Sequence, residues 1–101
     1  MAKLIYSGQA LADLERLTDF LAEGDPPVAS ETVGLIEEAV AVLRRHPLIG
    51  RPVEHELREL LISRGRTGYV ALYSFEEMQE AVLIHAIRHQ REAGYRDQGE
   101  D

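Results

Sequence analysis

Two stretches with helical periodicity come before a run of alternating apolar residues, and this order constrains the fold of the chain most strongly. In the first part of the chain, apolar side chains recur every three or four positions, as on one face of a helix. They are Leu11, Leu14, Leu17 and Leu21 in the first stretch and Val33, Ile36, Val40 and Leu43 in the second. From residue 57 onward the period falls to two, which is typical of strands. Helices followed by strands indicate an α+β domain.

The ends of both expected helices are marked in the sequence. Ser7 is a suitable N-cap for the first helix, and Gly24 ends it. Asp25 can cap the second helix, since it precedes two prolines that are tolerated in a first helical turn. The second helix closes on the cations of residues 44–46, which suit the negative end of a helix dipole, before Pro47. The short connection predicts an antiparallel helical hairpin.

The remaining residues predict one early strand and a later meander. Residues 4–6 form the first strand, and residues 47–56 form a loop that contains Gly and Pro. Three further strands are expected at 57–63, at 69–75 and at 82–87, with turns at 64–68 and 76–79. The order is β-α-α-β-β-β: an antiparallel sheet with the helical hairpin packed on one face and the first strand along an edge. Residues 1–95 form this single domain, and residues 96–101 are a polar tail.

Composition narrows the class of protein. With 101 residues and 45% apolar content, the chain is long enough for one hydrophobic core. The absence of Cys excludes disulfides, thiolate catalysis and Cys-based zinc sites. No uncharged apolar stretch is long enough for a transmembrane helix, and the N-terminal apolar run is too short for a signal peptide. These features predict a cytoplasmic protein.

Charge is unevenly distributed along the chain. The formal net charge of −7 weighs against general binding to nucleic acid, whose affinity comes largely from phosphate neutralisation. Most acids precede residue 64, whereas the last third holds a series of arginines: Arg64, Arg66, Arg88, Arg91 and Arg96. The strand that ends at Ile87 runs directly into Arg88-His89-Gln90-Arg91, and Tyr95 follows. A core does not need such a cluster, whereas a surface that contacts an anionic partner does.

The histidines near this strand end do not suggest a metal site. His85 and His89 are four residues apart, which separates them by about 13 Å along a strand. His89 beside Arg91 is compatible with a general base, but a polar residue at a strand end is the favoured interpretation. No cofactor is expected.

Four short segments, taken in order, match a known family. They are Ser7-x-x-Ala10-x-x-Asp13-Leu14, Pro47-Leu48-Ile49-Gly50-Arg51-Pro52, Gly68-Tyr69-Val70-Ala71-Leu72-Tyr73 and Ile84-x-x-Ile87-Arg88-His89-Gln90-Arg91. With this order of elements, the chain resembles the RelE/ParE superfamily of type II toxin–antitoxin toxins over nearly its whole length. The resemblance implies a cognate antitoxin, ParD-like or similar, that holds the toxin inactive. It implies no direct DNA binding except through the antitoxin, and it leaves open a homodimer or a hetero-oligomer with the antitoxin.

The resemblance implies two alternative activities. RelE-like members are ribosome-dependent mRNA interferases, and ParE-like members inhibit DNA gyrase. The nuclease branch places cations on the second sheet strand and after the Gly-Tyr of the central strand, where this chain has Leu61, Ser63 and Val70. The resemblance therefore favours the ParE-like, plasmid-stabilisation branch, a gyrase inhibitor that acts by binding. A RelE-like endoribonuclease and an inactive binding relative are the alternatives.

The candidate contacts for the target or the antitoxin share a basic or hydrogen-bonding side chain near the end of the chain. They are Arg64, Arg66, Arg88, His89, Arg91 and Tyr95. An amphipathic antitoxin segment is expected to bind mainly through apolar contacts, with the arginines fixing its register. No catalytic residue and no metal ligand is assigned.

Overall fold

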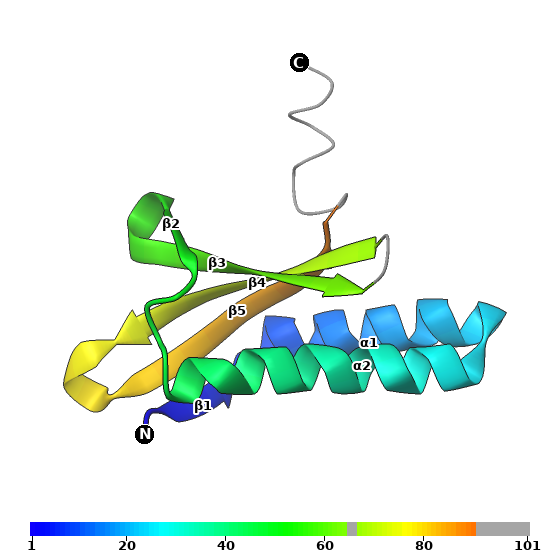
Figure 1. Cartoon of the computed structure of the whole chain (residues 1–101), viewed down its shortest axis with the longest axis horizontal. Coiled ribbons are helices and arrows are strands. Elements are labelled where there is room, and N and C mark those ends of the chain that lie inside the picture. The colour runs from blue at the N-terminus through cyan, green and yellow to red at the C-terminus, as the bar shows by residue number, and fades with distance from the viewer. Residues whose placement is uncertain (65–66, 91–101) are drawn as a thin grey trace, which may run out of the picture.

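The computed structural model describes residues 1–64 and 67–90, which form a sheet with two long helices against one face (Figure 1). The helices are α1 (Gly8–Gly24) and α2 (Pro26–Ala41), and a 3-10 turn at Val42–Arg44 follows α2. The strands are β1 (Lys3–Tyr6), β2 (Arg51–Val53), β3 (Leu57–Arg64), β4 (Thr67–Glu76) and β5 (Ala81–His89). The predicted α+β class and the helical hairpin are confirmed. Neither described helix is long and apolar enough to cross a membrane.

The five strands form one sheet in the order β1-β5-β4-β3-β2. The strands from β2 to β5 pair antiparallel in chain order, as a meander. β1 lies at the edge beside β5, as predicted, but runs parallel to it, so the sheet is mixed and not wholly antiparallel. A parallel pair needs a long crossover connection, and the helical hairpin together with the meander provides it.

The segment predicted as an unbroken loop contains structure of its own. β2 occupies Arg51–Val53, and a 3-10 turn occupies Glu54–Glu56. The sequence prediction is wrong here because a strand of three residues is too short to show an alternating pattern. β2 is the outer strand of the sheet, and this position suits Pro52, which has no N–H to donate to a neighbouring strand.

The predicted helix caps are present. The Ser7 hydroxyl accepts a hydrogen bond from the Ala10 N–H at 3.0 Å, and the Asp25 carboxylate accepts one from the Val28 N–H at 3.4 Å. α1 ends at Gly24, as expected. Ser7 has a second function beyond capping, because its hydroxyl also donates to the His85 carbonyl in β5 at 3.1 Å.

The core lies between the sheet and the helices. Its largest fully buried side chains are Tyr73, Ile36, Leu43, Ile84, Ile87, Val40 and Val82. On α1 the buried residues are Ala10, Asp13, Leu14 and Leu17. Leu11, which we expected on this face, is 56% exposed. The buried arc of α1 is rotated toward Asp13, so a pattern made of apolar residues alone misplaces it.

A β-bulge interrupts the pairing of β4 with β5. Leu72 lies opposite Ala86 and Tyr73 lies opposite Ile84, so His85 is the extra residue on β5. Ile84 and Ile87 are three residues apart, and in a regular strand they would point to opposite faces. The bulge brings both side chains into the core, where each is fully buried.

Replacing Leu14 or Ile36 by Asp should test how the hairpin packs on the sheet. Each change places an unpaired carboxylate in the core, and we expect a loss of about 3–5 kcal/mol in the free energy of unfolding, measured by urea denaturation. Leu11→Asp is the matched control on the same helix, and its effect should stay within about 0.5 kcal/mol because Leu11 faces solvent. A Leu14→Asp variant that unfolds like the parent would contradict the packing.

Candidate functional site

Two of the six predicted contact residues, Arg88 and His89, lie in the described chain at the end of β5. The backbone of Arg64 ends β3, but its side chain lies outside the description. Arg66, Arg91 and Tyr95 also lie outside the described residues. The contact role of all six stays a prediction, and the structure shows the surroundings of Arg88 and His89.

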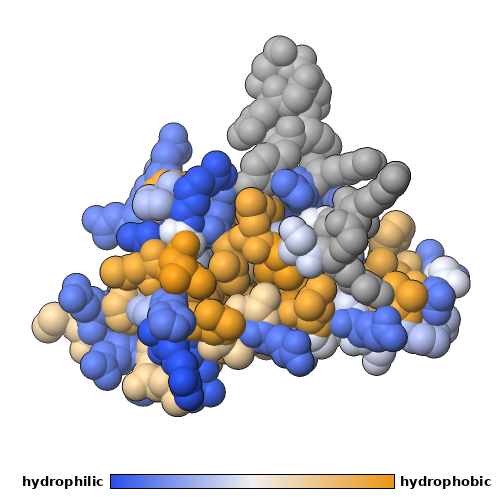
Figure 2. All heavy atoms as spheres, viewed as in Figure 1, coloured by the Kyte–Doolittle hydropathy of each residue, from blue (hydrophilic) through white to orange (hydrophobic). Residues whose placement is uncertain are grey.

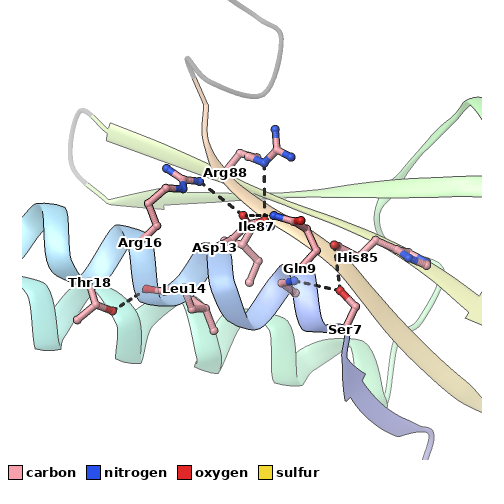
Figure 3. A network of polar contacts seen from close by, with 10 residues as sticks. Ser7, Gln9, Asp13, Leu14, Arg16, Thr18, His85, Ile87 and Arg88 are labelled. Atoms are coloured by element: carbon pink, nitrogen blue, oxygen red, sulfur yellow. Dashed lines mark hydrogen bonds and ion pairs between the residues drawn. The ribbon is translucent and has the colours of Figure 1, made fainter.

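Arg88 forms an ion pair with a buried carboxylate of α1 (Figure 3). Its Nε lies 3.7 Å from Asp13 Oδ2, and Arg16 Nη2 lies 3.7 Å from Asp13 Oδ1. The Asp13 side chain is only 3% exposed, whereas the Arg88 side chain is 43% exposed. Burying an unpaired carboxylate is costly, so both cations stabilise Asp13 in this position.

The carboxylate of Asp13 also accepts two hydrogen bonds. The Ile87 N–H donates to Oδ2 at 2.9 Å, and the Gln9 side-chain amide donates to Oδ1 at 2.8 Å. β1 stops at Tyr6, so the last part of β5 has no strand on this side. The hydroxyl of Ser7 and the carboxylate of Asp13 therefore continue the pairing of β5 after β1 has ended.

Our sequence interpretation assigned no role to Asp13. The pattern Ser7-x-x-Ala10-x-x-Asp13 contained a usable signal, because it sets an acid on the same helical face as Ala10 and Leu17. An acid at helical spacing within an apolar face predicts a buried, paired carboxylate. Its partner Ile87 lies 74 positions away in the sequence, and no local pattern identifies it.

The two histidines of β5 have different surroundings. The ring of His89 meets the ring of Tyr69 edge-on, with 5.4 Å between centroids. His85 Nε2 lies 2.8 Å from the hydroxyl of Ser74, which itself donates to Glu76 at 3.3 Å. Within residues 1–64 and 67–90, no group of three His, Asp or Glu side chains is arranged to hold a metal ion.

The sheet face opposite the helices carries the positions at which a nuclease site would be expected. Leu61 pairs with Val70 across β3 and β4, and Ser63 is two residues farther along β3, so these three side chains share one face. Leu61 is 57% exposed, so this face of β3 is open to solvent at that point. Arg88 lies opposite Val70 on β5 and places one cation next to this group.

The loop after α2 is held in place by two side chains of the sheet. The hydroxyl of Tyr73 donates to the Pro47 carbonyl at 2.7 Å and accepts from the Gly50 N–H at 2.8 Å. The Arg58 guanidinium donates to the carbonyls of Leu48 and Gly50 at 2.9 and 2.8 Å. Gly50 lies so near Tyr73 that a Cβ would come within 2.6 Å of the ring and the hydroxyl. This close approach requires glycine.

The tip of this loop exposes apolar side chains. Leu48 and Ile49 are both more than half exposed. Figure 2 shows hydrophobic residues gathered over the loop and between α2 and the sheet. Exposed or half-buried apolar residues of these elements and of the turn after α2 include Leu35, Val42, Leu48, Ile49 and Leu60, which we call the apolar surface. A surface of this kind suits contact with an apolar face of a partner.

Comparisons with known proteins agree on one superfamily. Residues 4–94 match the family model described as the ParE toxin of the type II toxin–antitoxin system parDE. Toxin RelE3 of Caulobacter vibrioides is 34% identical over 84 residues, which cover 83% of this chain and 89% of that toxin. Toxin RelE1 of the same bacterium is 36% identical over 70 residues, covering 69% and 75%.

Two solved structures have a similar fold. One belongs to a chromosomal ParDE system from P. aeruginosa, with a TM-score of 0.76, 26% identity and coverage of 88% of this chain and 96% of that one. The other is in the toxin–antitoxin complex RelBE2 from Mycobacterium tuberculosis, with a TM-score of 0.58, 26% identity and coverage of 88% and 98%. The matches therefore include proteins named for both ParE and RelE.

Replacing Tyr73 by Phe should loosen the loop. We expect a loss of about 1–3 kcal/mol in the free energy of unfolding at about pH 8, because the buried Gly50 N–H loses its acceptor. Burial raises the pKa of Tyr73, although the Gly50 N–H and Arg58 act in the opposite direction. The unfolded chain then loses this proton first, so the stability from Tyr73 is complete below about pH 10 and declines above it. Above about pH 10, the difference in free energy of unfolding between the parent and Tyr73→Phe should therefore become smaller.

Urea denaturation at several pH values measures this difference. Tyr69→Phe is the control, since Tyr69 is buried on the same strand but its hydroxyl does not join two loop residues in the described chain. Equal losses for the two variants would argue against the loop as the source of the effect.

Proposed function

We propose that this chain, which belongs to the ParE toxin family of type II toxin–antitoxin systems, inhibits DNA gyrase by binding and is neutralised by a cognate antitoxin. The observation that carries the proposal is the composition of the sheet face opposite the helices. There Leu61, Ser63 and Val70 stand together where a ribonuclease of this superfamily would need cations.

The chemistry of RNA cleavage explains why the lack of cations at these three positions argues against a ribonuclease. An attacking ribose 2′-hydroxyl needs a base, and the pentacovalent phosphate needs positive charge or hydrogen-bond donors close by. Losing one such donor typically lowers a rate by about 10²–10³-fold. Two aliphatic side chains and a hydroxyl supply little of this stabilisation, which supports an inhibitor that binds its target without cleaving it.

The apolar surface supports an antitoxin partner. An amphipathic helical segment can place its apolar side chains against Ile49 and its neighbours, as in other helix-in-groove complexes. The chain carries a net charge of −7, so an acidic antitoxin would gain little from long-range attraction and would bind mainly by apolar burial. The structural neighbours from P. aeruginosa and M. tuberculosis are described as toxin–antitoxin systems, which also supports this partner. In this proposal, the toxin and its antitoxin both lie in the cytoplasm.

A RelE-like mRNA interferase is the second candidate. The names of the relatives Toxin RelE3 and Toxin RelE1 favour it. Such an enzyme would need a rearranged site around the basic end of the chain. An inactive relative that only binds the antitoxin is the third candidate.

The purified protein should inhibit DNA supercoiling by gyrase and should leave mRNA intact on programmed ribosomes. The reason is that Leu61, Ser63 and Val70 supply no cation on this face, so that Arg88 beside Val70 would have to act without them. Both assays should use one preparation, with gel analysis of plasmid topology and primer extension of the mRNA as the measurements.

The antitoxin serves as the control in both assays, since its addition should restore supercoiling. Codon-specific cuts in the mRNA together with normal gyrase activity would overturn the gyrase proposal in favour of the nuclease. No effect in either assay would favour the inactive binding relative.

Changing Ile49 to Asp should weaken the complex with the antitoxin by about 1–3 kcal/mol, because a charge would replace an apolar contact in the centre of the proposed interface. Isothermal titration calorimetry measures the dissociation constant. Leu11→Asp is the matched control: Leu11 has similar exposure, 56% against 54% for Ile49, but lies on α1, outside the apolar surface. If Ile49→Asp and Leu11→Asp bind the antitoxin with equal affinity, the loop is not part of the interface.

A further inference from the structure

Arg88 directs only part of its guanidinium toward Asp13. The ion pair is made by Nε, at 3.7 Å from Asp13 Oδ2. Figure 3 shows the two terminal nitrogens of Arg88 directed away from Asp13 and from α1. Among the described residues these two nitrogens have no hydrogen-bond or ion-pair partner, and the side chain is partly exposed. Within residues 1–64 and 67–90, the outer half of the guanidinium is therefore open to a further partner.

Asp13 is itself held firmly in place. Its carboxylate receives the Ile87 N–H and the Gln9 amide, and its burial prevents it from swinging into solvent. A flexible arginine that is paired with a fixed, buried carboxylate samples fewer orientations than one that projects freely into water. Binding through such an arginine costs less conformational entropy.

We infer that Asp13 is a positioning residue for Arg88, and that Arg88 presents its two terminal nitrogens to a carboxylate of a protein partner. A carboxylate matches this pair because its two oxygens accept two parallel N–H bonds. The net charge of −7 disfavours nucleic acid, whose binding depends on neutralising many phosphates, whereas a single carboxylate needs only this local pair of donors. The inference rests on the proposed antitoxin binding and specifies the chemistry of one contact in it.

A double-mutant cycle tests this inference in solution. The probe is the protein encoded by the reading frame adjacent to the gene of this chain, titrated by calorimetry against the full chain. Arg88→Ala should raise the dissociation constant by about 10–100-fold, since about 1.4 kcal/mol corresponds to tenfold. Arg88→Lys should cause most of the same loss, because an ammonium keeps the charge but cannot form the paired contact.

Asp13→Asn should weaken binding several-fold in the parent and should have no further effect in the Arg88→Ala background. Asn keeps an oxygen that can accept the Ile87 N–H, so the edge of β5 can remain paired. Arg16→Ala is the matched control, since it removes the other cation beside Asp13 without changing Arg88, and the dissociation constant should stay within about twofold of the parent.

A second readout needs no partner. ¹⁵N relaxation of the arginine Nε–H groups should show an ordered Arg88 in the parent and a mobile Arg88 in Asp13→Asn. Thermal unfolding of the same samples separates this effect from stability, because a purely structural role for Asp13 would lower the melting temperature and leave the order of Arg88 unchanged.

Three outcomes would overturn the inference. Parent-like affinity of Arg88→Ala would remove the carboxylate contact, even if the antitoxin binds and the proposed function stands. If Asp13→Asn lowers the affinity equally in the parent and in the Arg88→Ala variant, Asp13 acts by stabilising the fold and not by positioning Arg88. If the parent does not bind the probe at all, the proposed function fails, and a mobile Arg88 in the parent would then overturn the positioning role as well.

Discussion

The side-chain hydrogen bonds to the edge of β5 connect the helical hairpin to the sheet. β1 pairs with β5 only as far as Tyr6, and beyond it Ser7 and Asp13 provide the partners. Unpaired backbone groups at a buried edge would cost free energy, so these two side chains complete the sheet. Ser7 also caps α1, and Asp13 follows within two turns. Together they fix where α1 starts and how it lies along β5, and the packing of the core depends on that placement.

The β-bulge at His85 makes this connection possible. Backbone groups of successive residues in a regular strand point to alternate edges, yet the carbonyls of both Ile84 and His85 face Ser7: one accepts its N–H at 2.9 Å, and the other accepts its hydroxyl at 3.1 Å. The extra residue shifts the alternation, so that the N–H of Ile87 also faces α1 and reaches Asp13. The same shift buries Ile84 and Ile87 on one face. A single irregular position thus serves both the edge and the core.

The parts of this fold that depend on local patterns were predictable from the sequence, and those that depend on distant contacts were not. Helical spacing around Leu14 and Ile36, the cap at Ser7 and the alternation in β4 gave the correct elements. Leu11 was misplaced because a pattern of apolar residues treats an acid such as Asp13 as exposed. The parallel direction of β1 depends on a strand at the other end of the chain. In the site, the sequence predicted Arg88 as a contact for an anionic partner, which stays a prediction, and it did not reveal the internal carboxylate beside Arg88.

That internal carboxylate bears on the two activities of the superfamily, because fold alone does not separate them. A ribonuclease needs net positive charge that acts on the phosphate as negative charge develops there. Asp13 offsets part of the positive field that Arg88 would exert on a bound phosphate, and it also pairs with Arg16 on its other side. Recognition of a protein partner depends more on the direction of hydrogen bonds than on net charge, and a fixed guanidinium retains that direction. The pairing of Arg88 with Asp13 and the apolar positions of Leu61 and Val70 next to it support the proposal of an inhibitor that acts by binding.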